Sequence, residues 1–299
     1  MRLGLVGLGR MGAGMARRLI ARGHQVTGYD LSEENVARLV QTGGEGAASL
    51  DELVDALEPP RHLWVMVPHG EPTRETIRAL VERSEPGDLV VDGGNSRFTE
   101  SLEHGRLCAE REILFLDVGV SGGVWGERKG FNLMVGGPDE GFRRLEPLLS
   151  DLAPPGGYAR VGETGAGHFV KMVHNAVEYA MLQALGEGFE CLRRSEFELD
   201  LARIADLWGH GSVVRSWLLE LLARAFAEGG NALEPVEGWV EDSGMGRWSV
   251  HYAVDHAIPL PGITTSLYER FASRDEERFR ARVIAALRQQ FGGHAVKED

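Results

Sequence analysis

The pattern of apolar and polar residues changes near residue 163. Before that point, short apolar runs alternate with segments of helical periodicity, and glycine-rich turns separate them. The runs that we predict to be buried strands cover residues 2–6, 25–29, 62–67, 88–92, 113–118, 132–135 and 158–161. Strands that alternate with helices predict an α/β domain over residues 1–163, with a parallel, doubly wound sheet.

Beyond residue 163 the strand patterns largely disappear, and the apolar residues follow helical spacing. A long helix is predicted over residues 165–194. Shorter helices are predicted at residues 200–208, 214–228, 248–257, 263–272 and 276–291. We therefore expect an all-α C-terminal domain over residues 164–299, with the long interdomain helix as its first element.

The long helix combines an apolar stripe with an unusual polar side. The residues expected to form the stripe, which recur at steps of three and four, are Val170, Val173, Val177, Ala180, Met181, Ala184 and Leu185. Another side carries an amine, an imidazole, an amide and a carboxylate, from Lys171, His174, Asn175 and Glu178. This side is either an ordinary solvated face with a Lys–Glu pair or part of a functional site.

The first predicted strand leads into a glycine-rich turn, Gly7-Leu8-Gly9-Arg10-Met11-Gly12, which is followed by a helical pattern. Strand, GxGxxG and helix in this order are the fingerprint of a Rossmann-type dinucleotide-binding domain. Gly7 permits the tight turn, Gly9 lets the backbone approach a pyrophosphate, and Gly12 lets helix and strand pack closely. The full context disfavours the alternative, a glycine-rich turn without a ligand.

Asp30 ends the second predicted strand, where an acidic residue can bind the ribose hydroxyls of a dinucleotide. A carboxylate repels a 2′-phosphate, and residues 31–34 contain no arginine that would bind one. We therefore predict NAD as the cofactor in preference to NADP. The alternative role for Asp30 is that of a helix cap or turn residue.

In doubly wound sheets, ligands bind beyond the carboxyl ends of the strands. Asn95 and Ser121 are expected just past such ends, in glycine-rich loops, although turn residues would fit there too. The residues that we assign to the cofactor are Gly7, Leu8, Gly9, Arg10, Met11, Gly12, Asp30, Val67, Pro68 and Asn95.

Composition and charge exclude several classes of protein. A formal net charge of −13 argues against a general nucleic-acid binder and against binding to an anionic membrane. The two cysteines have no CxxC or Cys/His ligand spacing, and no histidine motif is typical of a metal site. The apolar start is too short and too rich in glycine for a membrane span or signal peptide. We expect a cytoplasmic protein without a bound metal.

Several motifs together resemble one family. They are GLGRMG (residues 7–12), DGGNS (92–96), GVSGG (119–123), FNLMVGG (131–137), GAGHFVKMVHNAVEY (165–179), GRW (246–248) and FGGH (291–294). With these motifs the chain resembles the short form of the decarboxylating 6-phosphogluconate dehydrogenases, within the β-hydroxyacid dehydrogenase superfamily. His174 directly before Asn175, with Glu178 and Tyr179 after it, is the narrower mark of the phosphogluconate enzymes.

The resemblance implies an NAD-dependent oxidative decarboxylation of 6-phosphogluconate to ribulose 5-phosphate, as in gluconate use and the pentose phosphate pathway. Lys171 is then the general base and acid, and Glu178 the second acid. The residues implied to contact the substrate are Asn95, Ser121, Gly122, Gly123, His174, Asn175, Tyr179 and Arg270. The resemblance also implies a homo-oligomer, at least a dimer, in which Arg288 and His294 of the chain tail enter the neighbouring subunit's site.

The chain departs from the long members of this family in one loop. The long enzymes carry a Lys and a Thr as phosphate ligands before GRW, where Ser243 and Met245 stand here. One rival function is that of a 3-hydroxyisobutyrate or tartronate-semialdehyde type dehydrogenase, which needs no phosphate site. Another is a non-catalytic NAD-binding sensor, which the complete polar side of the long helix disfavours.

Overall fold

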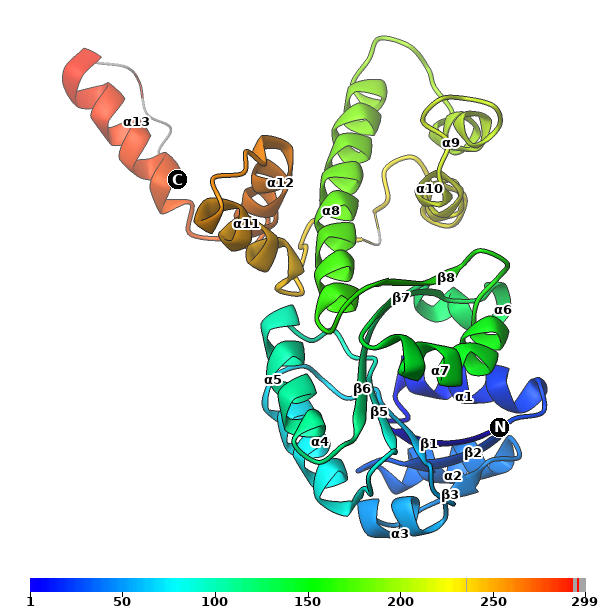
Figure 1. Cartoon of the computed structure of the whole chain (residues 1–299). Coiled ribbons are helices and arrows are strands. Elements are labelled where there is room, and N and C mark those ends of the chain that lie inside the picture. Colours follow the sequence, from blue (N-terminus) through cyan, green and yellow to red (C-terminus); the bar gives the residue numbers. More distant parts are fainter. Residues whose placement is uncertain (235, 293–294, 296–299) are drawn as a thin grey trace. The chain divides into compact units, whose positions relative to one another are not determined.

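The computed structural model describes residues 1–234, 236–292 and 295 (Figure 1). The contacts within the chain divide it into two compact units, Met1–His174 and Asn175–Asp299, and each unit is described by itself. The division falls inside the long helix α8 (Ala166–Arg193), whereas the predicted domain boundary at residues 163 and 164 precedes this helix. The domain limits themselves stay a prediction.

The first unit is built on one eight-stranded sheet with the strand order β3-β2-β1-β4-β5-β6-β7-β8. The strands are β1 (Arg2–Val6), β2 (Gln25–Tyr29), β3 (Glu45–Gly46), β4 (His62–Val65), β5 (Leu89–Asp92), β6 (Leu114–Ser121), β7 (Asn132–Gly136) and β8 (Tyr158–Gly162). All strand pairs are parallel except β6 with β7. The predicted doubly wound sheet is thereby confirmed.

The β6–β7 pair is antiparallel, and in this one pair the sheet departs from the parallel arrangement that we predicted. Residues 122–131 connect the two strands and contain only the short helices η1 (Gly123–Trp125) and α6 (Gly126–Lys129). A parallel crossover needs about a dozen or more residues, usually with a full helix. The short connection therefore reverses the chain direction. Ser121 is the last residue of β6. We had expected this residue just past the end of the strand.

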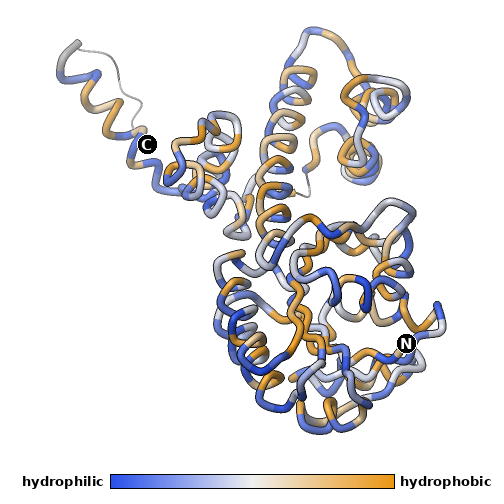
Figure 2. The backbone as a smooth tube through the Cα atoms, in the orientation of Figure 1, coloured by the Kyte–Doolittle hydropathy of each residue, from blue (hydrophilic) through white to orange (hydrophobic). Residues whose placement is uncertain are grey.

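Helices cover both faces of the sheet. They are α1 (Arg10–Ala21), α2 (Glu33–Gln41), α3 (Leu50–Asp55), α4 (Glu71–Arg83), α5 (Phe98–Ala109) and α7 (Asp139–Leu152). Strand β1 shows the alternation that separates the two layers, because Leu3 and Leu5 pack with α1 and α7, while Val6 packs with α3, α4 and α5. Figure 2 shows the apolar residues running along the strands between these layers.

The described residues of the second unit form helices only. After α8 come α9 (Leu201–Gly209), α10 (Trp217–Gly229), α11 (Met245–Asp255), α12 (Pro261–Ala272) and α13 (Phe279–Gly292). One apolar core joins α8, α9 and α10 through Phe189, Leu201, Ala205, Leu219 and Phe226. The predicted all-helical part is confirmed. Among the described residues, none of the helices has the length and apolarity that a membrane crossing requires.

The apolar stripe predicted for α8 is wrong. Val173, Val177 and Met181 leave 41%, 45% and 42% of their surfaces exposed. Met172 and Ala176 are buried instead, and Lys171 on the predicted polar side is only 6% exposed. The helix carries apolar residues on more than one side (Figure 2), so spacing alone did not identify the buried one. Burial of Lys171 excludes the solvated-face interpretation for this residue.

Candidate active site

The glycine turn between β1 and α1 has the geometry expected of a phosphate-binding turn. Gly7 lies in the left-handed region, with φ +93°, and its N–H donates to the Tyr29 carbonyl at 2.8 Å. A Cβ at Gly12 would lie 2.0 Å from the Gly7 carbonyl oxygen, so only glycine permits this close packing of helix on turn. A Cβ at Gly9 would meet no atom within 4 Å, which leaves the space above Gly9 open.

The start of α1 is suited to an anion. The first turn of the helix contains no acidic residue, and no side chain caps it. The first N–H groups of a helix lack partners within the helix and carry the positive end of its dipole. Together with the open space at Gly9, this turn fits the pyrophosphate of a dinucleotide.

A pocket of about 240 Å³ adjoins this turn, between α1 and α2. It is lined by Leu8, Gly9, Arg10, Ala13, Arg17, Asn35, Arg38, Leu39 and Thr42. Arg17 is held by Glu127 through two hydrogen bonds of 2.9 and 2.6 Å. Arg10 and Arg38 also lie in this wall, although no arginine directly follows Asp30 in the sequence.

Asp30 ties the end of β2 to the glycine turn. One carboxylate oxygen accepts the Leu8 N–H at 2.6 Å, and the other accepts the Ser32 N–H at 2.8 Å. Asp30 therefore acts as a turn residue, which is the alternative role that we considered for it. A carboxylate has about four acceptor sites, so two remain for ribose hydroxyls.

Val67 and Pro68 follow β4 and adjoin the same turn. A Cβ at Gly7 would lie 3.1 Å from Cγ1 of Val67, and the Pro68 carbonyl accepts a 2.8 Å hydrogen bond from the Thr73 hydroxyl. Asn95 is exposed in the loop after β5. These three residues lie past the carboxyl ends of neighbouring parallel strands, although Val67 was expected inside the strand.

The structure brings Ser121 and His174 together. The Ser121 hydroxyl is 3.4 Å from Nε2 of His174. Gly122 and Gly123 continue from Ser121 with φ +119° and +52°, conformations that glycine adopts without strain. A Cβ at Gly123 would meet no atom within 4 Å, so this loop also leaves room for close approach of a ligand.

Lys171 packs against strand β6 at Gly119, which lies two residues before Ser121. A Cβ at Gly119 would lie 2.4 Å from Cβ of Lys171, and one at Gly167 would lie 2.2 Å from the Asp117 carbonyl oxygen. Two glycines thus allow α8 to approach β6 closely at the position of Lys171. A lysine is almost never fully buried unless it is paired, so Lys171 beside the serine–glycine loop is a candidate functional residue.

Sequence reasoning missed Asp117, which fixes the start of α8. Asp117 is fully buried in β6, and its carboxylate accepts the Gly165 N–H at 2.6 Å and the His168 N–H at 2.8 Å. An acidic group at a helix N-terminus stabilises the helix. The available signal was a single Asp in the otherwise apolar run ILFLDVGV.

Asp92 and His168 form a second buried polar group that sequence reasoning missed. Burial alone would raise the pKa of the Asp92 carboxyl, but the charge of His168 and the polar groups of His104, Ser96 and Gly94 outweigh it and lower that pKa. Nδ1 of His168 is 2.7 Å from the Ser101 hydroxyl. These contacts join the loop of Asn95 to the helix of Lys171.

Asn175, Glu178 and Tyr179 lie in the second unit, on the continuation of α8. Asn175 and Glu178 are half-buried, and Tyr179 is 5% exposed. Gly246 allows the Tyr179 ring to pack closely, because a Cβ there would lie 2.7 Å from the ring. Within one helix, steps of three, four and seven residues keep Lys171, His174, Asn175 and Glu178 on one side.

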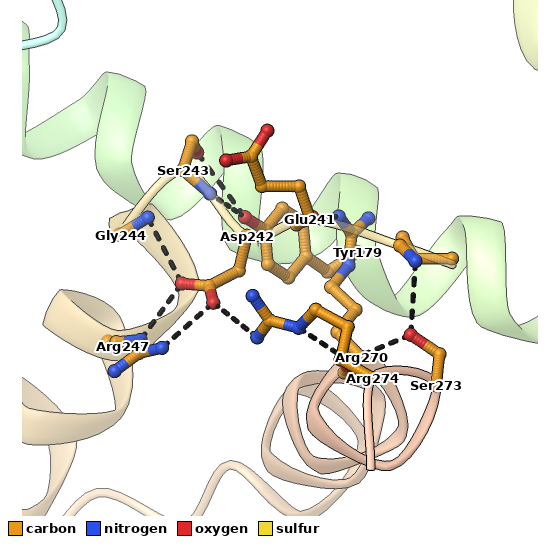
Figure 3. A network of polar contacts seen from close by, with 10 residues as sticks. Tyr179, Glu241, Asp242, Ser243, Gly244, Arg247, Arg270, Ser273 and Arg274 are labelled. Carbon is orange, nitrogen blue, oxygen red and sulfur yellow. Dashed lines mark hydrogen bonds and ion pairs between the residues drawn. The ribbon is translucent and has the colours of Figure 1, made fainter. Parts of the chain in front are cut away.

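Arg270 lies over the face of the Tyr179 ring, with Cζ 3.5 Å from the ring centroid (Figure 3). Its Nη1 donates to the Glu241 carbonyl at 2.6 Å. The Tyr179 hydroxyl accepts the Ser243 N–H at 3.0 Å, so Ser243 is connected to the same group. The structure thus brings together Tyr179, Arg270 and Ser243.

The remaining predicted residues lie in the tail. Arg288 is exposed on α13, and His294 lies outside the described residues. Within the described part of the chain, no group of three or more His, Cys, Asp or Glu side chains is placed to hold a metal ion.

Comparisons with known proteins agree with this geometry. Residues 2–164 match the family model described as the NAD binding domain of 6-phosphogluconate dehydrogenase, and residues 167–298 match the C-terminal domain of that enzyme. A Haloferax volcanii protein, named NAD(+)-dependent, decarboxylating 6-phosphogluconate dehydrogenase, is 44% identical over 99% of this chain and 98% of its own length.

Two solved structures are also similar. The Plasmodium falciparum 6-phosphogluconate dehydrogenase, described with its cofactor NADP+ and its substrate 6-phosphogluconate, has a TM-score of 0.85 at 26% identity. That similarity covers 100% of this chain and 66% of the Plasmodium chain. The Mycobacterium tuberculosis 3-hydroxyisobutyrate dehydrogenase has a TM-score of 0.72 at 25% identity, over 91% and 94% of the two chains. The chain belongs to the 6-phosphogluconate dehydrogenase family of oxidoreductases.

Proposed function

We propose that this enzyme oxidises and decarboxylates 6-phospho-D-gluconate to D-ribulose 5-phosphate with NAD. The observation that carries the proposal is the buried Lys171 on a helix side that also holds His174, Asn175 and Glu178. One side of a single helix then supplies both groups that the two proton transfers need. The 44% identical Haloferax relative, which bears this activity in its name, supports the proposal.

Lys171 is the proposed general base of the oxidation. Its amine would accept the proton of the substrate's 3-hydroxyl. A bound NAD would supply the acceptor for the hydride that leaves C3. The resulting ammonium group then donates a hydrogen bond to the new C3 carbonyl. As carbon dioxide leaves, this contact stabilises the negative charge that develops on the carbonyl oxygen.

Glu178 is the proposed acid of the last step. It lies seven residues after Lys171, two helical turns along the same side, and delivers the proton to C1 of the enediol. His174 and Ser121 hold the substrate near C3, and their 3.4 Å contact shows that both groups reach the same place. General acid–base catalysis of this kind contributes about 10²–10⁴-fold to the rate.

The substrate phosphate is assigned to Arg270, with Tyr179 and Ser243 beside it. Arginine suits this role because its planar guanidinium donates parallel hydrogen bonds to phosphate oxygens. Stacking on the Tyr179 ring fixes the plane of the guanidinium before the substrate arrives. We further propose a homo-oligomer in which Arg288 and His294 serve the neighbouring subunit's site.

The proposed preference for NAD depends on Asp30, whose carboxylate has two acceptor positions left for the ribose hydroxyls and repels a 2′-phosphate. The test is a panel of turnover assays with 6-phosphogluconate, gluconate and 3-hydroxyisobutyrate, each with NAD and NADP. The proposal predicts the highest kcat/KM for 6-phosphogluconate with NAD. A higher kcat/KM for 3-hydroxyisobutyrate contradicts the proposed substrate, and a higher value with NADP contradicts the role of Asp30.

A further inference from the structure

Two arginines bind one carboxylate in the second unit, and a third arginine, Arg270, lies nearby (Figure 3). Asp242 accepts Nε and Nη2 of Arg247 at 2.9 and 3.0 Å, and Nη2 of Arg274 at 2.9 Å. The Gly244 N–H adds a fourth hydrogen bond at 3.2 Å. Nε of Arg274 donates to the Arg270 carbonyl at 3.1 Å, so this cluster is joined directly to Arg270.

The carboxylate is inside the cluster and the guanidinium groups are outside. The Asp242 side chain is 3% exposed, whereas those of Arg274 and Arg247 are 24% and 50% exposed. Each guanidinium has five N–H donors. Asp242 takes two from Arg247 and one from Arg274, so both arginines keep donors on Nη1 for which the described residues provide no hydrogen-bond partner.

The cluster has an excess of positive charge. Hydrogen bonds from Arg247, opposed by burial and aided by Arg274 and the Gly244 N–H, lower the pKa of Asp242 to about 2, so it is ionised at neutral pH. Three guanidinium groups and one carboxylate leave two positive charges. The neighbouring Glu241 side chain is exposed, where solvent screens its charge. A phosphate monoester carries about −1.5 to −2 at neutral pH, which matches this excess.

The arginines are also held in fixed positions, as a binding site requires. Besides their bonds to Asp242, Cζ of Arg247 lies 4.7 Å and Cζ of Arg274 5.7 Å from the Phe271 ring centroid. Arg270, one helical turn before Arg274, is stacked on Tyr179. Ordering long side chains before binding reduces the entropy that the ligand has to overcome.

We infer that Arg247 and Arg274, held by Asp242, are phosphate-binding residues that act together with Arg270. This inference rests on the proposed function, because it names further ligands for the phosphate of the same substrate. It predicts that Arg247 and Arg274 determine the preference for the phosphorylated sugar acid. The competing explanation is that the cluster only fastens residues 241–247 to the end of α12.

The test is equilibrium binding of 6-phosphogluconate and of gluconate, measured by calorimetry on the full-length protein without turnover. Arg274→Met and Arg247→Met keep the length and apolar stem of the side chain and remove its charge. We expect each variant to weaken 6-phosphogluconate binding about 10- to 100-fold, since hydrogen bonds to charged groups are of this strength. Binding of gluconate should change less than threefold.

Arg194→Met is the matched control, because Arg194 also forms a salt bridge in the second unit, with Glu190 on α8, but lies outside the cluster. It should leave both affinities unchanged. Thermal unfolding of each variant identifies any that fail to fold, and Arg274→Lys and Arg247→Lys, which keep the charge, then replace them. The lysine variants should retain part of the preference for the phosphorylated ligand.

The outcomes separate this inference from the proposed function. If wild-type protein prefers 6-phosphogluconate and both methionine variants keep that preference, the inference is overturned and the proposed function stands. If the variants lose the preference but wild-type protein forms no ribulose 5-phosphate, the inference stands and the proposed function fails. If wild-type protein binds both sugar acids equally, the cluster is no phosphate site.

Discussion

Two alanine substitutions in the glycine turn should have opposite effects, because the turn uses its glycines for different reasons. At Gly9, with φ −64° and ψ −168°, an alanine fits the backbone and its methyl group meets no atom within 4 Å. Gly9→Ala should leave the free energy of unfolding unchanged or raise it by about 0.4–1 kcal/mol, because alanine lowers the conformational entropy of the unfolded chain. The same methyl group occupies the space assigned to the pyrophosphate. NADH binding should weaken at least about tenfold, or about 1.4 kcal/mol.

Gly12→Ala places its methyl group 2.0 Å from the Gly7 carbonyl oxygen, so backbone must move. Overpacking of this kind costs about 1–3 kcal/mol, and we expect the upper end because the obstacle is main chain. Gly186→Ala is the control, since it adds a methyl group in open space on α8 and should not affect NADH binding.

The assays are urea unfolding followed by circular dichroism, and titration of NADH fluorescence. Gly9→Ala should separate the two readouts, with full stability and weak NADH binding. If Gly9→Ala binds NADH as tightly as wild type, the cofactor does not approach the backbone at this turn. If Gly12→Ala is as stable as wild type, the close packing of α1 on the turn is refuted.

Three further substitutions test other parts of the account. Lys171→Met should lower kcat more than about 100-fold while NADH still binds; a variant with more than a tenth of wild-type kcat removes Lys171 from its role. Asp242→Asn should flatten the dependence of unfolding free energy on pH. The folded-state pKa of Asp242, about 2, lies below the ordinary aspartate pKa of 3.8. Its contribution to stability is therefore complete above pH 3.8 and is lost as the pH falls through about 2. An unchanged slope between about pH 5 and 3 would contradict this. Arg288→Ala should raise KM for 6-phosphogluconate at least about tenfold without changing the unfolding midpoint, and an unchanged KM places the tail outside the site.

The sequence predicted the sheet well because buried parallel strands are continuous apolar runs. Helix α5 was not predicted from the sequence. Its buried side consists of Ser101, His104 and Cys108, so the helix has no apolar stripe. The antiparallel direction of β7 was not predicted. It depends on the short connection after β6, whose helices η1 and α6 are too short to show a periodicity.

The candidate site was predictable where its residues are close in sequence. Lys171 and Glu178 share one helix, and the glycine turn is a single motif. The Asp242 cluster was not predictable, because Arg274 lies 32 residues from the carboxylate and meets it only in the folded unit. Asp117 and His168 are likewise separated in sequence, and their contact depends on the approach of α8 to β6 that Gly119 and Gly167 permit.

The most direct test of the central claim is the ratio of carbon dioxide released to NADH formed when the enzyme is incubated with 6-phosphogluconate and NAD. Radiolabelled C1 and absorbance at 340 nm report the two products in one reaction. Oxidative decarboxylation at the Lys171 and Glu178 site predicts one carbon dioxide for each NADH, with ribulose 5-phosphate as the sugar product. NADH formed without release of carbon dioxide, or no NADH from this substrate, would contradict the account.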